Sequence, residues 1–441
     1  MKIKEKLGYA NGNFGKQLLF GTLEFTLLFY LTDILGVNPL LSGIIIFLSL
    51  VLDALLDPVI GAWIERHKVR YGTYIFIGSI AYSLSFIALF SLAILGWNWV
   101  PVLCLVLAVI RASYTLIDVP HNAFISKLFA DGDERTQVSA YRFFFSCIAS
   151  MTVALAVTPI LSGDTTQDEA RNFFHFALIA GFLSFLSLSL VSKVAINHEV
   201  IPSRERNSQG FKEYFSNLLI LLRENKPFQL LLGVFFLTGA CSPALAKGMT
   251  YFAKYYLSEE SLSGLFLASI IAGQMLSLPL WVKMSARFEK KVALKSGHAL
   301  LFLSSGLFFI LAENSTILLI LAFLAGVANG AIYMLIWSLL ADVVDFQHYH
   351  SKIRNEAIVF AFSIMIMKVG LGVGSVILGW ILDVIGYNPG EKISEQVTSN
   401  MALFICLITA VGSLLCYMIL SKYRIDRKMQ KKMARAIKTY R

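Results

Sequence analysis

Two aspartates, Asp53 and Asp57, lie four residues apart in the apolar run from Leu40 to Ile64. That run is long enough to cross a bilayer as a helix, and residues four apart share one helix face. Two carboxylates at low dielectric cannot both stay ionised unless a cation joins them. Ionisable residues inside a membrane indicate a functional site. The pair therefore predicts a cation site, and the alternative is a structural ion pair with a basic residue of another helix.

A third carboxylate, Asp118, lies in another apolar run, two residues before Pro120. The proline removes one helix hydrogen bond and loosens the backbone there. Thr115 lies three residues before Asp118 on the same helix face, so its hydroxyl is placed to help bind a cation. Arg111, seven residues before Asp118, either compensates its charge or offers a guanidinium fork to carboxylate or hydroxyl groups of a ligand.

The composition places these residues in a membrane protein. Of the 441 residues, 57% are hydrophobic and 15% are charged, which leaves too little polar surface for a water-soluble protein of this size. The five cysteines fall in apolar runs without paired spacing, so neither a disulfide nor a metal cluster is expected. The net charge of +10 comes mostly from loops on one side. This pattern indicates membrane topology and excludes a nucleic-acid partner.

Twelve membrane spans are expected, because apolar runs of about 20 residues recur along the whole chain. Loops rich in Lys and Arg alternate with loops nearly free of both, and the positive-inside rule then places both termini in the cytoplasm. The expected location is the plasma membrane, in a bacterium the inner membrane. The spans lie near residues 8–35, 40–65, 72–96, 100–129, 137–162, 171–194, 227–257, 260–284, 292–312, 315–345, 355–387 and 397–421.

A polar link near the middle of the chain divides the spans into six and six. A weak internal repeat agrees with this division, because Pro58 recurs 221 residues later (279 minus 58) as Pro279. An all-α membrane protein of six plus six helices has the layout of the major facilitator fold, in which two halves rock around a midplane site. The expected parts are a first bundle at 1–194, a cytoplasmic link at 195–226, a second bundle at 227–421 and a basic cytoplasmic tail at 422–441.

Other polar residues inside the spans need a wet cavity or a partner, since each costs about 2.5–3.5 kcal/mol near the bilayer centre. Arg142 and Lys368 hold similar places in the fifth and eleventh spans, and Lys368 is placed to neutralise the acid pair when no cation is bound. Lys247 either faces a cavity or snorkels to the outer surface. His121 is expected to be a satisfied core histidine, and the glycines after Lys368 are expected to pack against another helix.

Charged residues near the cytoplasmic ends of the spans are typical of an inner gate. Ion pairs in such a gate close one face of the protein and break when that face opens. The alternative is an ordinary solvated loop surface. The residues concerned are Asp342, Asp345, Arg354, Glu356, Arg66 and Arg70.

Taken together, several motifs resemble the glycoside–pentoside–hexuronide:cation symporter family, nearly from end to end. The resemblance rests on the opening of the chain, on Tyr30-Leu31-Thr32-Asp33 at the end of the first span, on the second, fourth, fifth and eleventh spans, and on the region between the tenth and eleventh spans. The motifs are Gly12-Asn13-Phe14-Gly15-Lys16, Asp53-Ala54-x-x-Asp57-Pro58, Tyr114-Thr115-x-x-Asp118-x-Pro120, Arg142-Phe143-Phe144, Ala341-Asp342-x-x-Asp345 and Lys368.

This resemblance implies a secondary transporter that couples Na⁺, Li⁺ or H⁺ to a sugar. Asp53, Asp57 and Thr115 correspond to the cation site, where Na⁺ is the one metal ion considered. Lys16 and Lys368 are assigned to coupling. The residues assigned to substrate binding are Asp118, Arg142, Gln17, Asn122, Arg111 and Lys247.

The chain departs from the galactoside-binding pattern of that family. Gln17 replaces an aspartate and Asn122 replaces a tryptophan, so a galactoside is not the expected substrate. Leu56 replaces a polar residue, which removes a Na⁺ ligand and slightly favours H⁺. Arg111 and Lys247 are additional cations, and a positively biased cavity favours an anionic sugar such as a hexuronide.

We therefore expect cation-coupled sugar symport by alternating access, with no cofactor beyond the coupling H⁺ or Na⁺. The expected partners are the sugar, the cation and the lipid bilayer. The alternative is a lipid or drug carrier on the same fold, which predicts a wide lateral opening. A membrane enzyme is disfavoured because no nucleophile–base or metal-ligand set is visible, and a channel because nothing resembles a selectivity filter.

Overall fold

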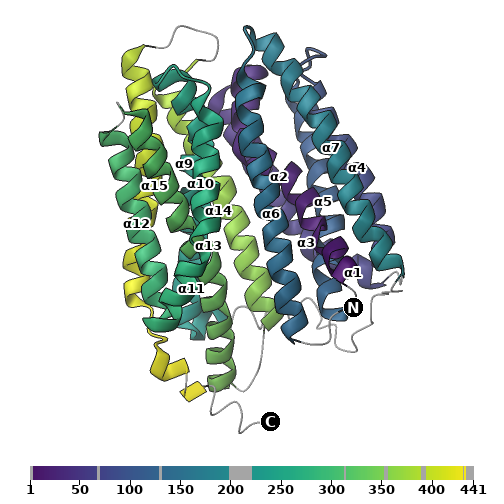
Figure 1. Ribbon diagram of the computed structural model, residues 1–441, viewed down its shortest axis with the longest axis vertical. Helices are drawn as coiled ribbons and strands as arrows, with labels where there is room; N and C mark the ends of the chain where they lie inside the picture. The colour runs from purple at the N-terminus through teal and green to yellow at the C-terminus, as the bar shows by residue number, and fades with distance from the viewer. Residues whose placement is uncertain are drawn as a thin grey trace. The chain divides into compact units, whose positions relative to one another are not determined.

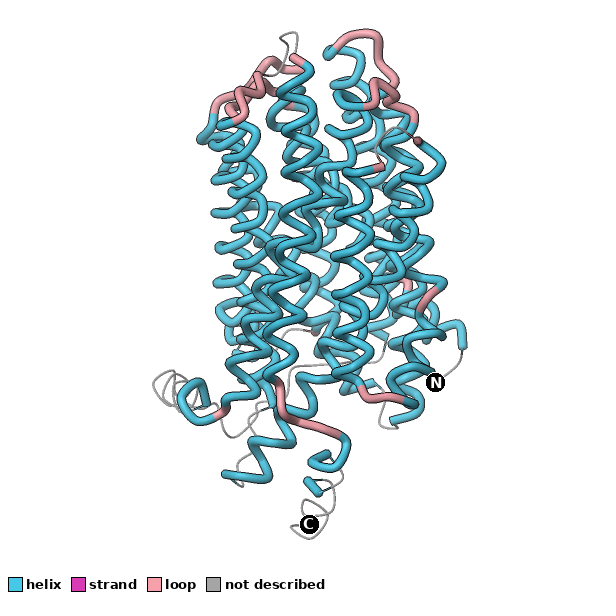
Figure 2. Tube along the Cα trace, turned by 90° about the vertical axis from the view of Figure 1, so that its left-hand side faces the viewer, coloured by secondary structure: helices cyan, strands magenta, loops and turns pink. Residues whose placement is uncertain are grey.

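The computed structural model describes residues 3–66, 70–128, 132–197, 221–311, 314–351, 356–388, 394–430 and 432–433. Every regular element in these ranges is a helix, as the cyan tubes of Figure 2 show. A helix satisfies its backbone N–H and C=O groups internally, which hydrocarbon cannot do for it. The long apolar runs of this sequence therefore become helices, and the prediction of an all-α membrane protein is confirmed.

The helices follow the predicted spans along the chain (Figure 1). The first predicted half contains α1 (Ile3–Ala10), α2 (Gly12–Phe29), η1 (Tyr30–Ile34), α3 (Pro39–Arg66), α4 (Tyr71–Ser91), α5 (Val100–Leu128), α6 (Gly132–Leu161) and α7 (Thr166–Asn197). The second contains α9 (Lys226–Tyr251), η2 (Phe252–Tyr256), α10 (Leu262–Leu276), α11 (Leu278–Arg287), α12 (Lys290–Ile310), α13 (Ser315–Ser351), α14 (Glu356–Val384) and α15 (Glu395–Lys422). The elements η1 and η2 are π-helical.

Within the described ranges, ten helices are long and apolar enough to cross a membrane, and the bent pair α10 and α11 makes an eleventh. The first predicted span is α2 with η1, whose Lys16 and Glu24 make it less apolar than the others. Several helices run beyond the predicted spans. Helix α6 begins at Gly132 and α13 ends at Ser351, because a helix can continue past the hydrocarbon into water with polar residues.

The predicted span 260–284 is broken. Helix α10 ends at Leu276 and α11 begins at Leu278, with a bend of 41° between their axes. Pro279 lies at the start of α11, and a proline lacks the N–H of a helix interior and disfavours helical geometry before it. Its repeat partner Pro58 lies inside the continuous helix α3. The helix is therefore broken at Pro279 in the second repeat but continuous at the matching Pro58 in the first.

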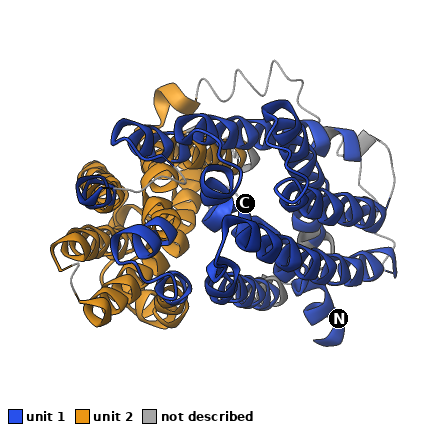
Figure 3. Cartoon of the chain, turned by 90° about the horizontal axis from the view of Figure 1, so that it is seen from above, with its two compact units in different colours: residues 1–205, 249–268, 375–401 blue, residues 206–248, 269–374, 402–441 orange. Residues whose placement is uncertain are grey.

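The chain forms two compact units, coloured separately in Figure 3. Unit 1 contains residues 1–205, 249–268 and 375–401, and unit 2 contains residues 206–248, 269–374 and 402–441. Within unit 1, α2 packs on α6 and α7, α3 packs on α5, and α4 packs on α5 and α7. Within unit 2, α12 packs on α11 and α13. The boundaries expected for the two six-helix bundles remain a prediction.

Of the three glycines that follow Lys368, Gly370 and Gly374 pack against a neighbouring helix, as predicted. A Cβ added to Gly374 would lie 2.1 Å from the carbonyl oxygen of Ala240, and one added to Gly370 would lie 2.4 Å from that of Phe236. Within unit 2, α14 and α9 therefore approach each other backbone to backbone, which only glycine allows at these positions.

Candidate functional site

The acid pair of α3 lies against a hydroxyl from α5. Asp53 is completely buried, and Asp57 is half-buried one helical turn further along. The hydroxyl of Thr115, also buried, donates a hydrogen bond of 3.1 Å to Asp53 Oδ1. Because α3 packs on α5, the acid pair of α3 and the hydroxyl of Thr115 on α5 form one group. These three oxygen-bearing side chains are the ones assigned to the cation from the sequence.

Arg111 reaches helix α3 one turn before Asp53 and is almost completely buried, with 1% of its surface exposed. Its Nε donates to Ser49 Oγ at 3.4 Å, and Ser49 lies one turn before Asp53 on α3. The guanidinium carbon lies 5.6 Å from the centre of the Phe20 ring, within the range of a cation–π contact. A buried positive charge thus accompanies the carboxylates of α3, whereas Asp118 is paired with another base.

Asp118, which is half-buried, forms an ion pair with the buried Lys16 of α2. Lys16 Nζ lies 2.6 Å from Asp118 Oδ1, and the Lys16 residue is only 5% exposed. The second carboxylate oxygen accepts a hydrogen bond of 2.8 Å from the Asn122 amide. Both oxygens of Asp118 therefore have described donors, which satisfies a charge that hydrocarbon would not tolerate.

Arg142 of α6 is held by two neutral amides. Its Nε donates to Asn13 Oδ1 at 2.9 Å and its Nη2 donates to Asn122 Oδ1 at 2.5 Å. The guanidinium also lies 5.7 Å from the centre of the Tyr9 ring. Among the described residues, no carboxylate forms an ion pair with Arg142. The arginine is thus oriented by hydrogen bonds while its charge is left for another group.

Further amide–hydroxyl contacts extend this group along α6. Asn13 Nδ2 donates to Ser146 Oγ at 3.1 Å, and Gln17 Nε2 donates to Ser150 Oγ at 3.1 Å. The result is an ordered polar chain from three helices, and we call it the polar chain: Lys16, Asp118, Asn122, Arg142, Asn13 and Ser146. Alternating donors and acceptors of this kind can bind hydroxyl or carboxylate groups of a small molecule.

Helix α5 connects the two groups of residues. Thr115 contacts Asp53, and Asp118, three residues further along, contacts Lys16. Residues three apart lie on one helix face. A small shift of α5 at the acid pair would therefore also move the carboxylate of the polar chain.

Two residues predicted for the site, Lys247 and Lys368, lie in unit 2. Lys247 on α9 is buried, with 7% of its surface exposed, and Lys368 on α14 is half-buried. Their assignments to substrate binding and coupling stay predictions.

The predicted inner gate is described only in part. Asp342 on α13 pairs with Lys290 Nζ at 2.8 Å and accepts a hydrogen bond of 2.7 Å from Gln430, all within unit 2. Arg70 is exposed at the start of α4, and Asp345 is half-buried on α13. Residue Arg354 and the side chains of Glu356 and Arg66 lie outside the described residues.

Sequence reasoning missed the neutral partners in the site. Asn13, Ser146 and Ser49 are uncharged, and nothing in their local sequence indicates a contact with a residue far along the chain. His121 meets its expectation in part: its Nε2 lies 3.1 Å from the backbone oxygen of Tyr9, and Tyr9 donates to the His121 carbonyl at 2.7 Å, but the buried Nδ1 has no hydrogen-bond partner among the described residues. It is a buried histidine that joins α1 to α5.

The family described as MFS/sugar transport protein matches residues 8–427 of the chain. YagG of Escherichia coli (strain K12), a candidate glycoside/cation symporter by its name, is 24% identical over 96% of this chain and 92% of its own length. The isoprimeverose transporter of Lactiplantibacillus pentosus is 22% identical over 98% and 90%. A sodium-dependent lysophosphatidylcholine symporter of Gallus gallus is 25% identical over 100% and 90%.

Solved transporters share the fold. The nucleoside transporter NupG superposes with a TM-score of 0.70 at 13% identity, covering 96% of this chain and 100% of its own. A D-xylose–proton symporter gives 0.67 at 13% identity, covering 95% and 96%. The prediction of a major facilitator fold is thereby confirmed, and the matched proteins are membrane transporters and not enzymes. The chain belongs to the MFS/sugar transport protein family.

Proposed function

We propose that this protein couples the entry of a cation to the import of a small sugar derivative, by alternating access across the plasma membrane. The observation that carries the proposal is the double role of α5, which joins Thr115 at the acid pair to Asp118 in the polar chain. A cation site and a hydroxyl-binding site on one helix can respond to each other. Relatives named as symporters support the coupling.

The coupling follows from charge. A cation bound at Asp53 and Asp57 cancels their repulsion, and the α5 contact passes the change to Asp118. A ligand that prefers one of two conformations shifts the equilibrium toward it. By linkage, cation and sugar then raise each other's affinity by the same factor. Sugar affinity that is indifferent to both pH and Na⁺ would contradict this scheme.

The charge balance of the two sites favours an anionic sugar. Within unit 1 the two sites contain three carboxylates and three bases, with Arg111 as a counter-charge for the acid pair, so this part of the site is neutral when empty and carries +1 once a cation binds. An anionic group, such as the carboxylate of a hexuronide, would restore neutrality, and the oriented guanidinium of Arg142 is the group to receive it. The six residues in this balance are Asp53, Asp57, Asp118, Lys16, Arg111 and Arg142.

A lysophospholipid carrier is the second candidate. It is favoured by the relative named a lysophosphatidylcholine symporter, which is matched along the whole of this chain. That name also includes sodium dependence, whereas Leu56 beside the acid pair favours H⁺. A lipid substrate would bring a long apolar chain, and the polar chain offers contacts only to a headgroup.

The deciding experiment is uptake into proteoliposomes. The panel contains neutral glycosides, hexuronides and lysophosphatidylcholine, each with and without Na⁺ at two pH values. We expect cation-dependent accumulation of a hexuronide. The variants Asp53→Cys and Asp57→Cys should lose accumulation but keep some substrate exchange, and concentrative uptake by either variant would exclude its role in coupling.

A further inference from the structure

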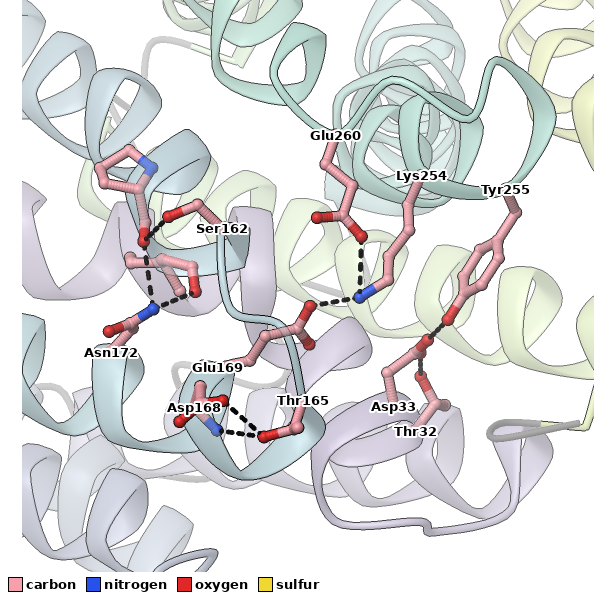
Figure 4. A network of polar contacts seen from close by, with 12 residues as sticks. Thr32, Asp33, Ser162, Thr165, Asp168, Glu169, Asn172, Lys254, Tyr255 and Glu260 are labelled. Atoms are coloured by element: carbon pink, nitrogen blue, oxygen red, sulfur yellow. Dashed lines mark hydrogen bonds and ion pairs between the residues drawn. The ribbon is translucent and has the colours of Figure 1, made fainter.

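A second cluster of polar side chains lies at the end of α2, away from the sites described above. Its centre is Asp33 in η1. The Asp33 carboxylate accepts hydrogen bonds from Tyr255, from Tyr387 at 2.5 Å and from its neighbour Thr32 at 2.6 Å. Figure 4 shows the Tyr255 hydroxyl directed at Asp33. Burial and the adjacent Asp33 carboxylate raise the pKa of Tyr387, so this phenol stays a neutral donor.

An ion-paired lysine forms the other arm of the cluster. Figure 4 shows Lys254 of η2 between Glu169, at the start of α7, and Glu260. The Lys254 ammonium pairs with both carboxylates, and its distance to the Glu260 carboxylate is 3.3 Å. The side chain of Glu169 is only 5% exposed. The lysine ammonium also lies 5.3 Å from the centre of the Phe29 ring. Two carboxylates and an aromatic face therefore hold the partly buried ammonium of Lys254 in place.

The contacts of this cluster tie distant segments together. Asp33 is 222 residues from Tyr255 and 354 from Tyr387, and Glu169 is 85 residues from Lys254. A further hydrogen bond of 2.6 Å joins Asn38 to Asp383. In each case one partner comes from the first predicted half and the other from the second.

The division of the chain into two compact units agrees with these contacts. Residues 249–268 and 375–401 come from the second predicted half, but both segments belong to unit 1 with residues 1–205 (Figure 3). Lys254, Tyr255 and Tyr387 lie in these two segments. The cluster is therefore internal to one compact unit and joins two parts of the second half to the first half.

The two π-helical segments mark equivalent positions in the internal repeat. Each is five residues long, and η2 begins 222 residues after η1 (252 minus 30). Asp33 and Tyr255 are separated by the same 222 residues, close to the 221 that separates Pro58 from Pro279. Equivalent positions of two repeats touch only near the axis that relates them. π-helical segments are rare and occur often at functional sites.

The cluster also lies at the end expected to face outward. The loops next to it, near residues 162–170 and 258–261, belong to the set nearly free of Lys and Arg. The positive-inside rule assigns such loops to the non-cytoplasmic side.

We propose that Asp33, Tyr255, Tyr387, Glu169 and Lys254 form the outer gate of the transporter. Their contacts hold the non-cytoplasmic end of the two predicted halves together, and they must break for substrate to enter from outside. Hydrogen bonds and ion pairs suit this role, because water replaces each partner when the gate opens. The proposal rests on the alternating access proposed above, but its test does not require the substrate to be known.

The first test measures access through the gate. Thr26 is 2% exposed and lies seven residues inward from Asp33 on α2, so Thr26→Cys is a conservative reporter, placed in a chain whose native cysteines are replaced. A membrane-impermeant maleimide should label it slowly. Adding Tyr255→Phe and Tyr387→Phe should raise the labelling rate at least tenfold, because Asp33 loses both phenol donors. Trp97→Cys, in an exposed outer loop, is the control and should be labelled equally in both backgrounds.

The second test locks the gate. A short bifunctional thiol reagent is applied to Asn38→Cys with Asp383→Cys, an exposed pair that joins α3 to the end of α14. Cross-linking should reduce uptake of the best panel sugar at least tenfold, and reduction should restore it. The control pair, Thr165→Cys with Asp168→Cys, is hydrogen-bonded within the first half and should leave uptake unchanged.

The two tests separate the proposals. An unchanged labelling rate for Thr26→Cys, or full uptake after cross-linking of the gate pair, would overturn the outer gate. If no panel sugar is transported at all, the proposed substrate class fails, while the labelling experiment still decides whether the gate exists.

Discussion

Lys16 Nζ lies 2.6 Å from Asp118 Oδ1, although 102 residues separate the two in sequence. The ammonium comes from α2 and the carboxylate from α5, so the pair joins two membrane helices at the proposed substrate site. Each charge is stable in the membrane because the other is present. The pair is therefore part of the fold as well as part of the binding surface.

Removing one partner of this pair should destabilise the protein more than removing both. In Lys16→Met or Asp118→Asn a charge loses its partner, which costs about 3 kcal/mol, the low end for buried pairs because Asp118 is 24% exposed. The double variant should melt closer to the wild type, while all three variants lose uptake. The melting temperatures of the wild type and the three variants in detergent give the order of their stabilities.

An exposed pair provides the control for this comparison. Arg171 and Asp168 form a surface ion pair with 60% and 42% of their side chains exposed, and such pairs add little stability. Asp168→Asn should therefore melt like the wild type. A double variant of Lys16 and Asp118 that melts below both single variants would show that the pair does not act as a unit.

Thr115 should contribute to the affinity of the site for the coupling cation. Thr115→Val keeps the shape of the side chain but removes the hydrogen bond to Asp53, a bond to a charged group worth about 1.5–3 kcal/mol. We expect half-maximal cation activation of uptake to move at least tenfold. Thr115→Ser retains the hydroxyl and should stay within about threefold of the wild type. Equal behaviour of the two variants would remove Thr115 from the cation site.

The positions of the helices could be predicted from the sequence because membrane spans leave a strong physical record. A span needs about 20 apolar residues, and the loops alternate in Lys and Arg content. The break before Pro279 was not predicted, because a proline alone does not show whether a membrane helix breaks: Pro58, its repeat partner, lies in an unbroken helix. A proline in a membrane helix is tolerated where neighbouring groups satisfy the freed carbonyl, and those neighbours are not visible in one sequence.

The site was predictable only where charge or spacing marked it. Asp53 and Thr115, which the family resemblance assigns to one cation site, form a hydrogen bond in the structure. The contact of Arg142 with Asn13 spans 129 residues and involves a neutral amide, so no local pattern indicates it. The Asp33 cluster was missed for a related reason, because its tyrosines look like ordinary aromatic residues near a membrane interface.

Close packing of α9 and α14 should limit substitution at Gly374. A Cβ there would lie 2.1 Å from the Ala240 carbonyl oxygen, a backbone atom that cannot easily move. Gly374→Ala should cost about 1–3 kcal/mol, as overpacked cores do, and lower the melting temperature in detergent. Gly306→Ala on α12 is the control, since nothing lies within 4 Å of its added Cβ. Equal melting of the two variants would contradict the backbone contact.

Arg142 should decide whether the substrate carries a negative charge. Its guanidinium is oriented by Asn13 and Asn122, so Arg142→Gln should reduce uptake of an anionic sugar about a hundredfold and affect a neutral glycoside less. Arg142→Lys keeps the charge but loses the planar fork, and it should fall between these results. Asn122→Asp places a negative charge beside the guanidinium and should shift selectivity toward neutral sugars.

The same charge balance predicts the response to membrane potential. One cation carried with a monoanionic sugar moves no net charge, so a potassium diffusion potential across proteoliposomes should change its uptake less than twofold. A neutral glycoside moves +1 with the cation, and an inside-negative potential should accelerate its uptake, because one charge is worth about 2.3 kcal/mol per 100 mV. If the potential drives the anionic sugar as strongly as the neutral one, then more than one cation is coupled to each sugar. The net charge moved per transport cycle would then differ from the charge expected from three acids and three bases.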